Sequence, residues 1–163
     1  MKKIFLPFML MFLVFNSFSQ YKVSPGKSKS SFDKAALKTD LNEIKELLVI
    51  AKGGIDAAIL SDKNNTKADT WLIRGDVYAA IAKGFPEMDN LAIEKAVESY
   101  DKIGTDIPTK DVTIIQNTTA GRQNLLSFFI NQAITALQGT NEANYEEAYD
   151  AFKLSLRVNP EDT

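Results

Sequence analysis

The chain contains no cysteine and no histidine among its 163 residues. The lack of cysteine excludes disulfides and thiol nucleophiles, and the lack of histidine excludes Ser-His-Asp and Cys-His catalytic systems and histidine metal ligands. Carboxylates such as Glu146, Glu147 and Asp150 remain, but adjacent side chains on a helix point about 100° apart and do not converge. A solvated helix face is the preferred interpretation, so the sequence predicts a non-enzymatic protein with no cofactor and no metal site.

The chain also lacks an excess of positive charge. Its 19 Lys and Arg residues and 21 Asp and Glu residues give a formal net charge of −2. Because nucleic-acid binding rewards a concentrated basic face, we expect no nucleic-acid partner. The length fits a single domain.

The apolar run at the N-terminus, residues 4–15, is shorter than the roughly 20 residues that span a bilayer. It follows two positive residues, Lys2 and Lys3, and precedes Ser17 and Ser19 at the two small positions that a signal peptidase reads. We therefore predict a signal peptide over residues 1–19. The protein is then expected to be exported and soluble, in the periplasm or outside the cell, with no transmembrane span after cleavage.

The remainder divides by composition into a linker and a helical domain. Residues 20–31 are rich in Ser, Lys, Pro and Gly, which predicts a flexible linker. Apolar residues recur at helical spacing over much of residues 32–163. Gly53 and Gly54 interrupt the first such pattern, at a cost on the order of 2 kcal/mol relative to alanine. Either the helix breaks at these glycines or a second helix approaches closely there.

Further helices are predicted over residues 70–83, 91–103, 122–137 and from Asn144, as an N-cap, to about residue 158. Gly104 is placed as a C-terminal cap of the second of these helices. Residues 109–121 have no assignment, because threonines and Gly121 interrupt their apolar pattern.

Two motifs indicate a repeat. The first is Trp71-x2-Arg74-Gly75-x2-Tyr78, with its members on one helical face. The second occurs twice, with steps of four, three and five residues ending in proline. Its two occurrences are Ala96, Tyr100, Ile103 and Pro108, and Ala148, Phe152, Ser155 and Pro160.

Together these motifs resemble the tetratricopeptide (TPR) repeat, W-x2-L-G-x2-Y…A-x3-F…P. The resemblance covers about residues 41–160 and implies an all-α solenoid of helical hairpins with about two and a half repeats. Arg74 departs from the expected leucine. Trp71, Tyr78, Tyr100 and Phe152 are expected to be buried anchors, and Gly75 is expected to admit a closely packed helix. The signal and divergent repeats together resemble periplasmic repeat proteins of Bacteroidetes-like bacteria.

The resemblance also implies a binding surface, because tetratricopeptide arrays bind ligands on the inner face of each first helix. By position this face comprises Leu72, Asp76 and Ala80, and Ile130, Asn131, Ile134 and Gln138. It predicts a scaffold of the cell envelope that binds a protein or peptide; packing of the apolar members against the next repeat is an equal interpretation. A carbohydrate or small-ligand binding protein, with sugar rings stacked on Phe85, is the alternative function.

The last predicted helix is apolar where a terminal cap is normally polar. We therefore expect self-association through this helix, or a chain that is part of a longer array.

Overall fold

The computed structural model describes residues 24–138 and 144–159, and this described part is all-helical, as predicted. Its elements are α1 (Pro25–Ala35), α2 (Leu41–Ala58), α3 (Asp62–Asn65), α4 (Ala68–Gly84), the 3-10 helix η2 (Pro86–Met88), α5 (Ala92–Thr105), α6 (Val112–Leu137) and α7 (Tyr145–Val158). No helix in this part combines the length and hydrophobicity needed to cross a membrane. The predicted signal peptide, residues 1–19, lies outside the described residues, as does Pro160.

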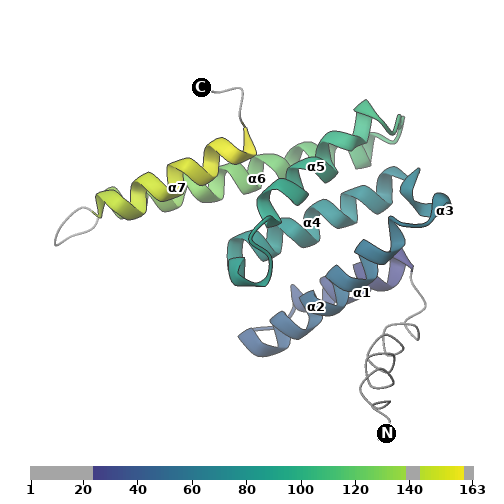
Figure 1. The fold of residues 1–163 in the computed structure, drawn as a ribbon, viewed down its shortest axis with the longest axis horizontal. Coiled ribbons are helices and arrows are strands. Elements are labelled where there is room, and N and C mark those ends of the chain that lie inside the picture. Colours follow the sequence, from purple (N-terminus) through teal and green to yellow (C-terminus); the bar gives the residue numbers. More distant parts are fainter. Residues whose placement is uncertain (1–23, 139–143, 160–163) are drawn as a thin grey trace, which may run out of the picture.

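The helices form three neighbouring pairs: α1 with α2, α4 with α5, and α6 with α7. Helix α4 lies in the middle and contacts both α2 and α6, so it joins the three pairs (Figure 1). In this view α7 lies in front of α6, and the α6–α7 pair projects beyond the other helices at one end. The main hydrophobic core is shared by all three pairs, with α4 contributing the most buried residues.

Helix ends follow local capping chemistry. The Asp40 carboxylate accepts hydrogen bonds from the backbone N–H of Asn42 and Glu43 at 2.9 and 3.0 Å, which starts α2. Asn144 caps α7 through the N–H of Glu147, as predicted. Gly104 has φ +95° and interrupts the helical path at the end of α5, which confirms its predicted capping role.

The predicted linker is wrong from residue 25 onward, because Pro25–Ala35 forms α1. Ser24 caps this helix by accepting a hydrogen bond from the N–H of Lys27, and Pro25 occupies its first turn. The buried residues of this helix are Ser28 and Ala35. One of them is polar, so the helix lacks the apolar stripe by which a helix is recognised in a sequence. Residues 20–23 of the predicted linker lie outside the described residues.

The glycine pair in α2 marks a close approach and not a break. Helix α2 continues through both residues, and a Cβ at Gly54 would collide with the hydroxyl of Ser28 on α1. Small residues on both helices therefore let α1 and α2 pack closely, which completes a third helix pair where the sequence predicted half a repeat.

The unassigned segment, residues 109–121, is mostly the first part of the 26-residue helix α6. The Asp111 carboxylate accepts hydrogen bonds from the N–H of Thr113 and Ile114, which starts the helix. Gly121 lies in its interior, where a glycine is unfavourable by about 1 kcal/mol. The reason for this glycine is a contact with another helix.

That contact is made by Tyr100, whose ring is inserted between two glycines. A Cβ on Gly75 of α4 would lie 2.7 Å from Cδ1 of Tyr100, and a Cβ on Gly121 of α6 would lie 2.6 Å from its hydroxyl oxygen. Both distances are too short for packed atoms. The close approach predicted at Gly75 is therefore present, and the same ring on α5 fixes the spacing of three helices.

Most predicted anchor residues are buried. Trp71, Tyr78 and Tyr100 are exposed by 6%, 0% and 2% respectively. Small motif residues Ala96 and Ala148 are also buried. Two motif residues behave differently: Phe152 is 40% exposed, so its prediction as a buried anchor is wrong, and Pro108 is exposed after α5. Phe152 lacks a neighbouring helix on its side of α7 within the described residues.

We predict that Gly75→Ala destabilises the protein by roughly 1–3 kcal/mol, because the Tyr100 ring is also packed closely against Gly121, which limits how far it can move. The matched control is Gly53→Ala in α2, where a Cβ meets nothing within 4 Å. This control should stabilise the protein by about 0.5–1 kcal/mol through helix propensity. Urea unfolding followed by circular dichroism measures both changes; shifts in the same direction would contradict this account.

Candidate functional site

The predicted binding residues of α4 lie on one helical face, but they are largely used by the fold. Leu72 and Ala80 are half-buried against the main core. Asp76 is also half-buried, and its carboxylate accepts a hydrogen bond from the Tyr100 hydroxyl at 2.9 Å. These three residues therefore have packing partners, and little of their surface is free for a ligand.

Burial raises the pKa of the Asp76 carboxyl, and the hydrogen bond from Tyr100 and the charges of Lys29 and Lys83 only partly oppose this. Burial also raises the pKa of the Tyr100 hydroxyl, with the charge of Asp76 as a further cause. The hydroxyl is therefore the proton donor at neutral pH. The pair fixes the orientation of the Tyr100 ring between its two glycines.

We predict that Asp76→Asn stabilises the protein increasingly as pH rises. Folding raises the pKa of the Asp76 carboxyl above its ordinary value of 3.8, so the folded state binds this proton more tightly than the unfolded state does. The wild-type protein therefore loses stability as pH rises from the ordinary value through the raised value, and the asparagine variant does not. The asparagine carbonyl still accepts the Tyr100 hydrogen bond without burying a charge. Urea unfolding of both proteins from about pH 3 to about pH 7 measures the difference; a pH-independent difference would contradict the prediction.

The predicted residues of α6 lie on one side of the helix. Ile130, Ile134 and Gln138 follow one another at steps of four residues, and Asn131 lies three residues before Ile134. Asn131, Ile134 and Gln138 are exposed, Ile134 by 40%, and Ile130 is half-buried. The exposed members of the predicted binding face therefore all belong to α6.

Asn131 belongs to a longer row that the sequence analysis missed. Asn117, Asn124 and Asn131 recur every seven residues on α6, and all three are exposed. Within residues 24–138 and 144–159, their side-chain amides have no intramolecular hydrogen bond. Seven residues of helix rise about 10.5 Å, which sets the spacing of this amide row. The seven-residue interval is visible in the sequence once residues 109–121 are known to be helical.

The helix that carries the amide row is nearly free of charge. Helix α6 contains a single charged residue, Arg122, in its 26 residues. The Arg122 guanidinium pairs with Asp101 and donates to the carbonyl oxygen of Val158 at 3.0 Å, so it ties α6 to α5 and α7. The amide row is therefore a neutral polar surface that offers both donors and acceptors.

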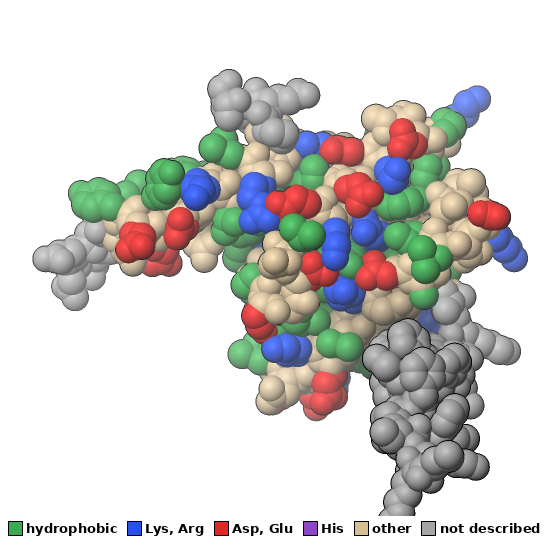
Figure 2. Space-filling model, viewed as in Figure 1, with side chains coloured by type: hydrophobic (Ala, Val, Ile, Leu, Met, Phe, Trp, Pro, Cys, Tyr) green, Lys and Arg blue, Asp and Glu red, His purple; other side chains and the backbone are tan. Residues whose placement is uncertain are grey.

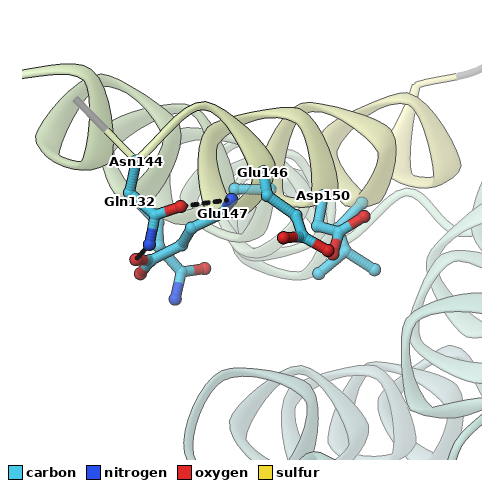
Figure 3. A pocket seen from close by; sticks show the side chains of 7 residues that line it. Gln132, Asn144, Glu146, Glu147 and Asp150 are labelled. Atoms are coloured by element: carbon cyan, nitrogen blue, oxygen red, sulfur yellow. Dashed lines mark hydrogen bonds between the residues drawn. The ribbon is translucent and has the colours of Figure 1, made fainter. Parts of the chain in front are cut away.

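An acidic hollow of about 370 Å³ lies beside α7. Figure 3 shows Glu146, Glu147 and Asp150 on one side of α7, with Gln132 of α6 beside Asn144. Asn144 donates to the Glu147 carboxylate at 3.0 Å. Glu146, Glu147 and Asp150 were expected to point in different directions because they are close together on one helix. All three nevertheless line the same open hollow. The described residues contain no cluster of His, Cys, Asp and Glu that could hold a metal ion.

Arg74, the departure from the repeat pattern, is a structural residue. It is 6% exposed, and its Nη1 donates to Ser99 Oγ at 2.7 Å and to Glu98 Oε2 at 3.1 Å. The guanidinium carbon lies 5.0 Å from the centre of the Tyr78 ring. The repeat pattern has a leucine at this position, which would make apolar contacts. Arg74 instead makes hydrogen bonds that connect α4 to α5.

Tyr78 extends this network to α2. Its hydroxyl donates to Asp56 Oδ2 at 2.6 Å, and burial, followed by this hydrogen bond, raises the hydroxyl pKa well above its usual range. Lys52 and Lys95 place their ammonium groups 5.7 and 5.2 Å from the ring centre. Because the polar groups of this network mostly contact one another, we assign it to stability and not to ligand binding.

Comparisons of the chain with protein-family models, curated proteins and solved structures find no match. The candidate binding surfaces are therefore defined by the chain's own residues: the neutral amide row of α6 and the acidic hollow beside α7.

Proposed function

We propose that this chain is a non-enzymatic interaction scaffold of the tetratricopeptide type, which binds a protein or extended peptide mainly along α6, the first helix of the last pair. The three helix pairs that meet at α4 support the repeat assignment. So do Trp71, Tyr78 and Tyr100, which occupy the aromatic motif positions and are buried. The predicted signal peptide over residues 1–19 supports export to the periplasm or the outside of the cell.

The amide row is the observation that carries the binding proposal. A peptide in the extended polyproline II conformation makes one turn in three residues, about 9.3 Å, which is close to the interval between successive asparagines of the row. Successive asparagines can therefore meet the same side of the peptide backbone at points three residues apart. A side-chain amide donates and accepts, so it pairs with a peptide N–H and C=O irrespective of the peptide side chain.

Charge supplies the selectivity in this proposal. The acidic hollow of Glu146, Glu147 and Asp150 favours a partner with basic side chains. Leu72, Asp76 and Ala80 of α4 are half-buried and have packing or hydrogen-bond partners within the fold. The ligand surface therefore lies mainly on the α6–α7 pair.

We predict that Asn117→Ala, Asn124→Ala and Asn131→Ala, combined in one variant, weaken partner binding roughly 100-fold, since three hydrogen bonds contribute about 1 kcal/mol each. Cross-linking in cells followed by mass spectrometry identifies the partner, and titration of the purified partner gives its affinity. Asn42→Ala, an exposed asparagine on α2, is the matched control. Unchanged partners and affinity for the triple variant would reject the amide row as the binding surface.

The carbohydrate alternative is not favoured by the position of Phe85. This side chain is half-buried and packs against the main core, so it does not offer an open platform for a sugar ring. Its role next to η2 is to close the end of α4, where its backbone N–H donates to the Ile81 carbonyl at 2.8 Å.

A further inference from the structure

The outer side of α7 carries a continuous apolar stripe. Tyr145, Tyr149, Phe152 and Leu156 are 74%, 62%, 40% and 42% exposed. Their steps of four, three and four residues are those of the contact positions in a coiled coil. Figure 2 shows hydrophobic side chains along the free edge of α7, with acidic side chains on another side of the helix. We call these four residues the α7 stripe.

The projecting end of the α6–α7 pair is held together by small side chains. Ala133 and Ala136 of α6 and Ala148 and Ala151 of α7 are its buried residues, and none of them belongs to the main hydrophobic core. Alanine buries little apolar surface compared with an aromatic side chain. This end therefore exposes larger apolar side chains than it buries. A second helix packed on the α7 stripe would bury those large side chains.

Charges beside the stripe indicate what that helix is. Glu146 and Lys153 each follow a stripe residue directly, so they lie on the same flank of the stripe, seven residues apart. Neither forms an ion pair within the described residues. By contrast, Arg157 is already bound to Glu94 of α5. Asp150 lies on this flank as well, one step farther from the stripe, and the ammonium group of Lys153 lies 5.3 Å from the centre of the Tyr149 ring. Glu146 and Lys153 are thus the acid and the base that flank the stripe most closely.

A second copy of α7 complements this pattern in one orientation. In an antiparallel pair related by a two-fold axis, Tyr145 meets Leu156 of the other copy and Tyr149 meets Phe152. The same rotation places Glu146 beside Lys153 of the other copy, twice. In a parallel pair this flank of one helix faces the opposite flank of the other, which carries Ala148 and Ser155, so Glu146 and Lys153 gain no charged partner.

We propose that two copies of this protein associate through their α7 stripes, with the two α7 helices antiparallel and Glu146 of each paired with Lys153 of the other. The interface is isologous, so it closes at a dimer and leaves no repeating contact. The projection of the α6–α7 pair in Figure 1 leaves the free edge of α7 clear of the other described helices. The association goes beyond the proposed peptide binding; it leaves the amide row aside and shares only Glu146 with the acidic hollow.

Charge reversal tests this dimer in the full-length protein. Glu146→Lys and Lys153→Glu should each raise the dimer dissociation constant about tenfold, because each change puts like charges at both symmetric contacts. The double variant E146K/K153E restores opposite charges and should recover the original constant. Glu46→Lys, an exposed glutamate on α2, is the matched charge control and should change nothing. Sedimentation velocity over a range of concentrations measures each constant, with circular dichroism as the check of folding.

A disulfide measurement tests the orientation independently. Because the chain contains no cysteine, a protein with Glu146→Cys mixed with one carrying Lys153→Cys should form a disulfide between the two proteins under mild oxidation. The Glu146→Cys protein alone should form far less. A monomer at all concentrations would overturn the proposal, even if it bound a different protein through α7. A dimer that is indifferent to the single charge reversals would overturn it as well.

Discussion

The insertion of the Tyr100 ring between Gly75 and Gly121 is the contact on which the arrangement of the helices depends. It sets the distance from α5 to both α4 and α6, because neither glycine position has room for a Cβ. The contact places a large apolar ring at the junction of two helix pairs, with 2% of the residue exposed. Its cost is two glycines in helix interiors and a half-buried carboxylate, Asp76, that accepts the ring's hydroxyl.

A second tyrosine, on α4, makes the same kind of contact with the helix pair that precedes it. Tyr78 of α4 donates to Asp56 of α2 at 2.6 Å, as Tyr100 of α5 donates to Asp76 of α4 at 2.9 Å. In each case a buried ring supplies apolar contact and a directional hydrogen bond reaches the neighbouring helix. Apolar packing alone tolerates sliding of one helix along another. The two tyrosine–aspartate bonds fix the positions along the helix axes, and the Arg74 network adds a third fixed connection.

Sequence reasoning located the elements whose signals are local. Apolar spacing found most of α4, α5 and α7, and the residues Gly104 and Asn144 marked helix ends correctly. The N-terminal part of α6 was missed because Gly121, which reads as a helix breaker in the sequence, is explained only by its contact with a tyrosine on another helix. The first part of α1, residues 25–31, was predicted as a linker because its buried residue is Ser28, which packs against Gly54 of α2 and leaves no hydrophobic pattern there.

The candidate site shows the same limit. The motif positions identified Asn131, but the amide row becomes visible only when α6 is continuous through Asn117 and Asn124. Leu72 and Ala80 are apolar residues that could face a ligand or a neighbouring helix, and only the packed structure shows that they contact the core. Whether Phe152 is buried depends on which elements pack beside α7. The residues near Phe152 in the sequence do not carry this information.

The two proposed surfaces divide the α6–α7 pair by chemistry. The amide row on α6 is polar and uncharged, which suits a partner that exchanges water for hydrogen bonds and dissociates readily. The α7 stripe is apolar, with Glu146 and Lys153 directly beside it, which suits a symmetric and longer-lived contact. Because the surfaces lie on different helices, dimerisation through α7 leaves the amide row open. A dimer then presents two rows, and a partner with two binding segments gains affinity through the high effective concentration of the second row.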